Sequence, residues 1–384
     1  MNFLIVGAGI SGATIARVLA EAGANVRVLE TEAHPGGNCH TARDAETGIM
    51  VHHHGPHIFH SYNPAVWDFV ERFADFMPYR HKVVASHDGQ HFQIPINLDT
   101  INAFFKDQMD SAEAEAFIAS RRVVLDHEPR NFEEAALATI GPELYGAFFR
   151  GYTRKQWGRA PTDLPAKVFA RLPVRFNHDD NYFHHARIAI PREGYTAMTQ
   201  AMLDHPGIDV QYGCDAAAFR AEAGFDHTIY TGPLDAYFDH AHGRLAYRTL
   251  DFRHERQRGT ALPATSVNYP GEDVPQTRIT EHKWFAPWES HDETIISYEI
   301  PREAGPGDRL YYPVNLADGS STLSDYVSAA RGTSGVSFVG RLATFKYIDM
   351  DVAIGLALSA ADRIVKHAAN GAQIPAFLNG EFEG

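Results

Sequence analysis

The first thirty residues constrain the fold of this chain more than any other stretch. Residues 3–6 are apolar and rich in branched side chains, as in a buried strand, and they lead directly into Gly-Ala-Gly-Ile-Ser-Gly at 7–12. A helical pattern of apolar residues covers 13–22, and a second strand pattern over 26–29 ends on Glu30. This order of strand, Gly-x-Gly-x-x-Gly, helix, strand and acid predicts a dinucleotide-binding βαβ unit.

The glycines and the acid of this motif have separate predicted roles. We expect Gly7 to permit a tight turn, Gly9 to let a diphosphate approach the backbone, and Gly12 to let the helix pack closely on the strand. The free N–H groups at the start of the helix would face the diphosphate, and Glu30 would accept hydrogen bonds from a ribose diol. The alternative is an ordinary βαβ unit that binds no dinucleotide and whose glycines are incidental.

Composition narrows the class of protein. A chain of 384 residues is too long for one ordinary core, and 44% hydrophobic with 21% charged residues is typical of a soluble globular protein. A net charge of -14 without a long basic run argues against nucleic acid as a partner. Cys39 and Cys214 show no metal spacing, which favours a reduced, cytoplasmic chain. No segment approaches eighteen continuous apolar residues, so we expect no membrane insertion.

The patterns along the rest of the chain predict an α/β protein of three parts. These are a discontinuous Rossmann-like dinucleotide-binding domain, an inserted helical domain followed by a mobile substrate loop, and an antiparallel β-sheet domain. The first would comprise 1–75, 195–240 and 309–384, the second 100–165, and the third 76–99, 166–194 and 241–308. Within them we expect a helix over 63–76 and a strand over 182–190.

The bound cofactor is predicted to be a flavin. Gly36 and Gly37 follow Glu30 closely, a pairing that resembles flavin-binding proteins more than NAD-only dehydrogenases. The run Gly305-Pro306-Gly307 is not followed by a helix pattern, which argues against a reductase with two nucleotide-binding domains. Because Gly-x-Ser-x-Gly, Cys/His pairs and paired catalytic carboxylates are absent from the sequence, we expect the cofactor to carry the chemistry.

Five histidines stand between residues 52 and 60. Three of them are spaced three apart, as on a metal-binding helix face, but Gly55-Pro56 breaks a helix there and no acid or cysteine accompanies them. We therefore expect most of these histidines to be structural and no metal to bind. His57 directly follows the Gly-Pro turn, and it is the best candidate for a functional histidine.

Arginines and aromatic residues are candidates for a second ligand. A guanidinium can bind a diphosphate with two parallel hydrogen bonds, and four arginines lie in non-helical contexts: Arg171, Arg248, Arg278 and Arg341. The polar, ring-bearing stretch 152–158 predicts a surface on which a base or sugar could stack. The alternatives are solvated surface charges for the arginines and core packing for the rings.

Five longer stretches resemble the bacterial UDP-galactopyranose mutase family. They are GPHIFH at 55–60, GYTRKQW at 151–157, RLPVRFN at 171–177, DNYF at 180–183, and residues 340–351 with GR at the start and YIDMD at the end. Together with the Gly-rich loop they occur in family order over nearly the whole chain. Phe345-Lys346-Tyr347 departs from the Tyr-Arg-Tyr expected there.

The resemblance implies a homodimeric FAD enzyme that interconverts UDP-galactopyranose and UDP-galactofuranose. In that family the flavin is active in its reduced form: N5 attacks the anomeric carbon, UDP leaves and later returns, and no net redox change occurs. The alternatives are an FAD-dependent amine oxidase or desaturase, and a non-catalytic flavin-binding protein. His57 favours the plain galactose substrate, since a related N-acetylgalactosamine-nucleotide mutase is expected to have arginine there.

Roles follow by matching positions to the family. Arg171, on a mobile loop, and Arg278 would hold the UDP diphosphate, and His57 would lie beside the flavin. The implied substrate-binding residues are Phe148, Phe149, Tyr152, Thr153, Trp157, Tyr182, Arg248, Asn268, Tyr312 and Tyr347. The implied cofactor-binding residues are Gly7, Gly9, Ser11, Gly12, Glu30, Gly37, Asn38, His57, Gly340, Arg341, Asp349 and Met350.

Overall fold

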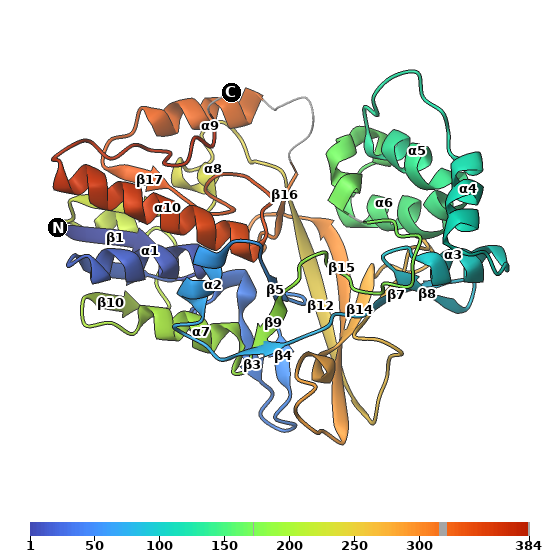
Figure 1. Cartoon of the computed structure of the whole chain (residues 1–384). Coiled ribbons are helices and arrows are strands. Elements are labelled where there is room, and N and C mark those ends of the chain that lie inside the picture. Colours follow the sequence, from blue (N-terminus) through green and yellow to red (C-terminus); the bar gives the residue numbers. More distant parts are fainter. Residues whose placement is uncertain (172, 315–320, 383–384) are drawn as a thin grey trace.

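A five-stranded parallel sheet forms the centre of the dinucleotide-binding part. The computed structural model describes residues 1–171, 173–314 and 321–382, without the side chains of 170 and 171. The strand order is β10-β2-β1-β11-β17, all parallel. The strands are β1 (Asn2–Val6), β2 (Asn25–Leu29), β10 (Ile208–Gln211), β11 (His227–Tyr230) and β17 (Val336–Phe338). Strands from the N-terminal, middle and C-terminal stretches therefore build one sheet, and the predicted Rossmann-like fold is confirmed (Figure 1).

Small residues let two long helices lie close together beside this sheet. Helix α1 (Ile10–Glu21) buries Ala13 and Ala16, and α10 (Met350–Ala369) buries Ala357, Ala360 and Ala361. Alanine has high helix propensity and a short side chain, so these helices approach closely without losing helical stability. Figure 1 shows α1 and α10 side by side at the N-terminal end of the molecule.

A seven-stranded sheet forms the middle of the molecule (Figure 1). Its order is β16-β12-β15-β14-β13-β7-β8, and within this sheet the described strands pair antiparallel except for β13 and β7, which are parallel. The strands are β7 (Val83–His87), β8 (Gln90–Ile94), β12 (Tyr247–Arg258), β13 (Ser266–Asn268), β14 (Arg278–Glu281), β15 (Glu293–Glu303) and β16 (Tyr312–Pro313). The predicted antiparallel sheet is thus confirmed apart from one parallel pair.

A helical unit stands at the far end of this sheet (Figure 1). It contains α3 (Leu98–Phe105), α4 (Ser111–Arg121), α5 (Phe132–Leu144), the π-helix η2 (Tyr145–Arg150), α6 (Gly151–Trp157), and the 3₁₀ helices η3 (Pro161–Asp163) and η4 (Ala166–Arg171). The start of α6 lies so close to Pro270, which follows β13, that a Cβ at Gly151 would collide with the Pro270 carbonyl oxygen. Lys155 fastens the same helix by donating to the backbone oxygens of Tyr269 (2.7 Å) and Gln276 (2.9 Å).

Short elements connect these parts. They are η1 (Gly37–Cys39), β3 (Thr41–Arg43), β4 (Met50–His52), β5 (Phe59–His60), α2 (Pro64–Val70), β6 (Phe76–Pro78), β9 (Ile188–Pro191), α7 (Gly194–Leu203), η5 (Ala218–Ala221), α8 (Leu234–Tyr237), η6 (His282–Phe285) and α9 (Ser321–Arg331). Within the described residues, no helix is both long and apolar enough to cross a membrane.

Two predicted elements are shorter than expected. The helix predicted over 63–76 ends at Val70, and the strand predicted over 182–190 covers only Ile188–Pro191. In the segment before that strand, Asn177 and Asp179 accept hydrogen bonds from backbone N–H groups two residues further on (3.0 Å each). Such local side-chain bonds favour turns over a ladder, and this explains why residues 177–181 do not lead directly into a strand.

Candidate active site

A cavity of about 600 Å³ lies at the carboxyl edge of the parallel sheet. Its walls come from the β1–α1 loop, the segment after β2, the loop after β11 and the start of α10. All twelve residues predicted to bind the cofactor line it: Gly7, Gly9, Ser11, Gly12, Glu30, Gly37, Asn38, His57, Gly340, Arg341, Asp349 and Met350. The edge where parallel strands end is where such folds bind nucleotides.

The glycines of the first loop differ in what requires them. A Cβ at Gly12 would collide with the carbonyl oxygen of Gly7, and Gly7 itself has φ +105°. The protein alone therefore requires both residues. Gly9 has an ordinary φ of -69°, and a Cβ there would meet nothing nearer than the Gly37 Cα at 4.0 Å. The open space beside Gly9 fits a ligand that lies against the backbone, as the diphosphate of a dinucleotide does.

Glu30 is held in the cavity wall by backbone donors. It is 7% exposed, and its Oε2 accepts the N–H of Ala8 at 2.7 Å while Oε1 accepts the N–H of Glu32 at 2.9 Å. Oε1 also accepts from the Thr31 hydroxyl at 3.1 Å. Oε2 keeps a further lone pair, so Glu30 can still accept from a ribose hydroxyl. Helix α1 begins nearby without a side-chain cap, which leaves its first N–H groups to bind an anion.

His57 presents one acceptor nitrogen to this cavity. Its Nδ1–H donates to the Gly55 carbonyl at 2.8 Å, so that Nε2 carries the lone pair. Burial, and then the positive charges of Arg341 and Arg278, lower the pKa of His57 to about 4. The ring is therefore neutral at pH 7.

Arg278 stands in a row of polar residues across the seven-stranded sheet. Asn268 on β13 is directly opposite Arg278 on β14, and Arg278 is opposite Glu299 on β15. The Arg278 Nε lies 3.3 Å from the Glu299 Oε1, and the Glu299 side chain is only 2% exposed. Burial opposes the charge of Arg278, but Glu299 and nearby tyrosines raise its pKa, so the guanidinium stays charged. Asn268 adds a buried acceptor, Oδ1, with no hydrogen-bond partner among the described residues.

Aromatic residues surround this charge. Tyr152, Tyr182 and Tyr312 all lie close enough to Arg278 to interact with it electrostatically, and burial raises the pKa of Tyr152 to about 12. The Tyr347 ring is edge-on to Tyr312 (5.3 Å between centroids) and to Trp157 (6.0 Å). Arg341, in the wall of the dinucleotide cavity, lies 5.3 Å over the Tyr347 ring. The aromatic cluster is therefore continuous with that cavity.

Other predicted substrate residues lie elsewhere or outside the description. Phe148 packs on Phe92 (5.3 Å) and Phe149 on Phe169 (5.4 Å), both in the core of the helical unit. Thr153 is 4% exposed on α6. Arg171 ends η4, and its side chain lies outside the described residues.

Arg248 caps the C-terminal end of α6 and is therefore not available to bind a substrate. It is 4% exposed, and its guanidinium donates to the backbone oxygens of Gln156 (3.0 Å) and Lys155 (2.9 Å). Replacing it with Met would leave two partly buried carbonyls without these donors, and we expect a loss of about 2–4 kcal/mol in the free energy of unfolding. Urea denaturation measures this. Arg253→Met on the same strand removes an exposed ion pair with Glu255 (3.2 Å) and a cation–π contact with Tyr298 (4.2 Å), and it should cost about 1 kcal/mol. Equal losses in the two variants would contradict the capping role.

Glu299 is a residue of this site that sequence reasoning missed, as are Thr31, Cys39, Thr231 and Arg309 in the wall of the dinucleotide cavity. The signal for Glu299 is the run Thr-Ile-Ile-Ser-Tyr-Glu-Ile at 294–300, where a carboxylate interrupts a buried strand. Burial raises the pKa of Glu299 and Arg278 lowers it, with burial the larger effect. A buried acid in such a strand needs a cation opposite it, and that cation is Arg278.

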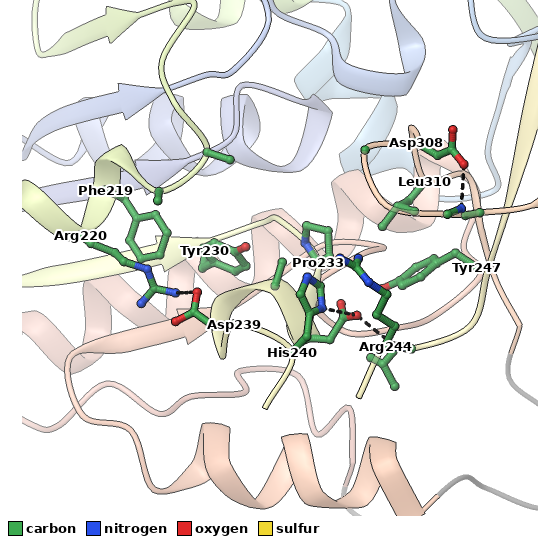
Figure 2. Close-up of a pocket in the computed structure, with 18 residues that line it drawn as sticks. Phe219, Arg220, Tyr230, Pro233, Asp239, His240, Arg244, Tyr247, Asp308 and Leu310 are labelled. Carbon is green, nitrogen blue, oxygen red and sulfur yellow. Dashed lines mark hydrogen bonds and ion pairs between the residues drawn. The ribbon is translucent and has the colours of Figure 1, made fainter. Parts of the chain in front are cut away.

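A second cavity of about 430 Å³ adjoins the first (Figure 2). The two cavities share the lining residues Ala216, Tyr230, Pro233, Gly307, Asp308 and Leu310. Buried Asp235 holds one wall, because its Oδ2 accepts from the Nδ1 of His240 (3.1 Å) and the N–H of Leu245 (3.0 Å). None of the site residues predicted from the sequence lines this cavity in the described part of the chain.

Buried neutral histidines make stability depend on pH. His81, His227 and His282 are at most 4% exposed, and burial lowers their pKa values to about 3, 4 and 3. No three metal-binding side chains converge among the described residues. Unfolded histidine titrates near 6.5, so on acidification the unfolded state takes up protons that the folded state refuses.

We therefore expect the melting temperature to be steady above about pH 6.5 and to fall steeply below it. Each of these histidines contributes up to about 1.4 kcal/mol per pH unit until its folded pKa is reached. Calorimetry from pH 8 to pH 4.5 measures the effect. A melting temperature that stays constant down to pH 4.5 would contradict the neutral, buried state of these rings.

Comparison with known proteins identifies the family of this chain. The family model described as UDP-galactopyranose mutase matches residues 147–347, and one described as NAD(P)-binding Rossmann-like domain matches 5–73. A probable UDP-galactopyranose mutase of Klebsiella pneumoniae is 46% identical over 98% of both chains. A dTDP-fucopyranose mutase of Escherichia coli is 43% identical over 95% of this chain and 98% of its own. The crystal structure of a reduced UDP-galactopyranose mutase has the same fold, with a TM-score of 0.73, 16% identity, and 98% of this chain and 99% of that chain covered.

Identity of this level over nearly the full length, together with a family match over more than half of the chain, decides the assignment. The resemblance predicted from the sequence is confirmed: the chain is an isomerase that belongs to the UDP-galactopyranose mutase family.

Proposed function

We propose that this protein binds FAD and interconverts UDP-galactopyranose and UDP-galactofuranose. The observation that carries the proposal is the Arg278 guanidinium, four-fifths buried and facing an aromatic cluster that adjoins the dinucleotide cavity. A fixed charge of this kind, next to a cofactor site, suits the diphosphate of a nucleotide sugar. An amine oxidase has no use for such a charge, and the family match also disfavours that alternative.

The cavity residues fit FAD. The first N–H groups of α1 and the open space at Gly9 would hold the diphosphate, and Glu30 would hold a ribose. Asn38, Gly340 and Met350 would contact the remainder, with the N-terminus of α10 favouring negative charge there. When bound and reduced, FAD would supply a nucleophilic nitrogen, N5, for the anomeric carbon of the sugar.

Side chains of the protein would bind the diphosphate and stabilise its negative charge. The bond from the anomeric carbon to its oxygen breaks, and UDP leaves with the bonding electrons as an anion. Arg278, and by family match Arg171, would stabilise that developing charge and hold UDP in place until the bond re-forms. Tyr152, Tyr182 and Tyr312 lie near Arg278, and with substrate bound their rings would shield it from water and strengthen its interaction with the anion.

Two substrate pairs need to be compared, because the relatives named for UDP-galactopyranose and for dTDP-fucopyranose are 46% and 43% identical. Histidine at position 57 favours a plain hexose over an N-acetylated one, as the family resemblance implies. Between the two pairs we propose UDP-galactose, because the matching family model is described as UDP-galactopyranose mutase and the relative named for it is the more similar of the two. The homodimer and the cytoplasmic location stay predictions.

A substrate panel tests the proposal. FAD-loaded, dithionite-reduced protein is incubated with UDP-galactofuranose, the furanose form of dTDP-fucose, or UDP-N-acetylgalactosamine, and the products are separated by chromatography. UDP-galactopyranose should form with the highest kcat/KM. A higher kcat/KM for the dTDP-fucose pair would reassign the substrate, and oxygen consumption with an amine in the absence of any isomerisation would overturn the mutase proposal.

A further inference from the structure

Two buried histidines hold the turn that carries His57. His52 ends β4 and is 0% exposed, and its Nδ1 accepts the backbone N–H of His57 at 3.1 Å. His282 begins η6 and is 1% exposed, and its Nδ1 accepts the backbone N–H of His52 at 3.2 Å. Each imidazole therefore fixes one backbone position of the segment between the small β3–β4 sheet and the dinucleotide cavity.

The two backbone donors determine which nitrogen carries the proton in each ring. A backbone N–H can only donate, so the Nδ1 atoms of His52 and His282 are lone-pair acceptors, and each neutral ring is protonated on Nε2. Nε2–H of His282 then donates to the Ser297 Oγ at 2.5 Å, which leaves the Ser297 hydroxyl to donate to Nδ1 of His254 at 2.6 Å. With these proton positions, each of the hydrogen bonds that link Ser297 on β15 to the His57 turn has one donor and one acceptor.

His57 is the last residue in this chain of hydrogen bonds, and its own groups are held by further partners. Its Nδ1–H donates to Gly55 (2.8 Å), and its carbonyl accepts from the Tyr195 hydroxyl at 3.0 Å. With its N–H bound by His52, both backbone groups and one ring nitrogen of His57 are held in place. Among the described residues the hydrogen bonds of His57 leave Nε2 for a ligand, and the residue lines the dinucleotide cavity.

Burial favours the acceptor form of both supporting rings. It lowers the pKa of His282 to about 3 and that of His52 well below its usual range, with neighbouring histidines adding to each shift. Nε2 of His52 is buried without a hydrogen-bond partner among the described residues, and the ring stacks on Phe285 at 4.3 Å. What this ring contributes is therefore the acceptor Nδ1 and its packing.

We propose that His52 and His282 are positioning residues of the reaction, which act by holding His57 in its place beside the cofactor. Neither lines the dinucleotide cavity in the described part of the chain. The proposal rests on the proposed function, since it assumes that His57 contacts the bound flavin.

A pair of variants at position 52 separates the acceptor from the packing. In His52→Asn the amide oxygen can take the place of Nδ1 and accept the His57 N–H, whereas His52→Leu fills a similar volume without an acceptor. We expect kcat of His52→Leu to fall about 10- to 100-fold, because small misplacements of catalytic groups have effects of this size. His52→Asn should stay within about threefold of the wild type. His282→Asn and His282→Leu should repeat the contrast more weakly, one hydrogen bond further from His57.

The bound flavin gives a readout that does not depend on turnover. The absorbance spectrum and the midpoint potential of bound FAD should shift in His52→Leu and return to wild-type values in His52→Asn. His53→Leu is the matched control, because its ring stacks on His40 (4.9 Å) and lies edge-on to His254 (6.0 Å), but among the described residues its side chain makes no hydrogen bond to the His57 turn. We expect its spectrum and potential to equal those of the wild type.

Two results would overturn the proposal. One is a His52→Leu protein with wild-type kcat, spectrum and potential. The other is an equal loss in His52→Leu and His52→Asn with an equal fall in melting temperature, which would reduce the role of His52 to packing. A wild-type protein that isomerises no nucleotide sugar would refute the proposed function instead, while the flavin spectra of the two variants would still test the positioning role.

Discussion

Replacing Arg278 with Met is expected to lower kcat/KM for UDP-galactofuranose by about 100- to 1,000-fold, the usual cost of removing one group that stabilises developing negative charge. Flavin binding should persist, since Arg278 is not among the residues that line the dinucleotide cavity in the described structure. The variant also leaves Glu299 buried without its cation, and breaking such a pair costs roughly 3–5 kcal/mol of stability. A loss of activity alone would therefore be ambiguous.

The double variant Arg278→Met/Glu299→Gln resolves this ambiguity. It removes both buried charges, so we expect most of the lost stability to return. Activity should not return, because the diphosphate still lacks its guanidinium. Steady-state kinetics and urea denaturation on the single and double variants measure the two quantities separately. Recovery of activity together with stability would show that Arg278 serves only the fold.

Replacing Gly9 with Ala is expected to weaken FAD binding by about 100-fold, or roughly 2.7 kcal/mol, without changing the stability of the flavin-free protein. The backbone of Gly9 suits any residue and the protein leaves its Cβ free space, so the penalty arises only when a diphosphate approaches. Gly12→Ala should behave oppositely and destabilise the flavin-free protein, because its Cβ collides with Gly7.

Fluorescence titration with FAD and thermal melting of the flavin-free proteins provide the data. Gly146→Ala is the control, since a Cβ there meets nothing within 4 Å and the residue is in the helical unit. It should match the wild type in FAD affinity and melt at the same or a slightly higher temperature. Unchanged FAD affinity in Gly9→Ala would mean that the ligand does not pass along this loop.

The dinucleotide cavity was predictable because its constraints are local. Gly7, Gly9, Gly12 and Glu30 act within a single βαβ unit, and the spacing of their residue types reflects one backbone geometry. The later cofactor positions, such as Gly340 and Met350, came from the family resemblance, and the structure brings them to the same cavity.

The partners of the arginines were not predictable, because strand register is not visible in a single sequence. Arg278 meets Glu299 only because β14 and β15 pair in one register, and a shift by one residue would turn the two side chains to opposite faces. Arg248 looked equivalent to Arg278 in its sequence context, yet it lies where α6 ends and binds two carbonyls there. Phe148 matched the family pattern but packs in the helical core.

The central claim is that UDP binds with its diphosphate at Arg278, beside the dinucleotide cavity. A crystal structure of the FAD-loaded protein with UDP tests it most directly. We predict diphosphate oxygens within about 3 Å of the Arg278 guanidinium, with the uracil against the rings of the helical unit. A diphosphate bound out of reach of Arg278 would contradict the account.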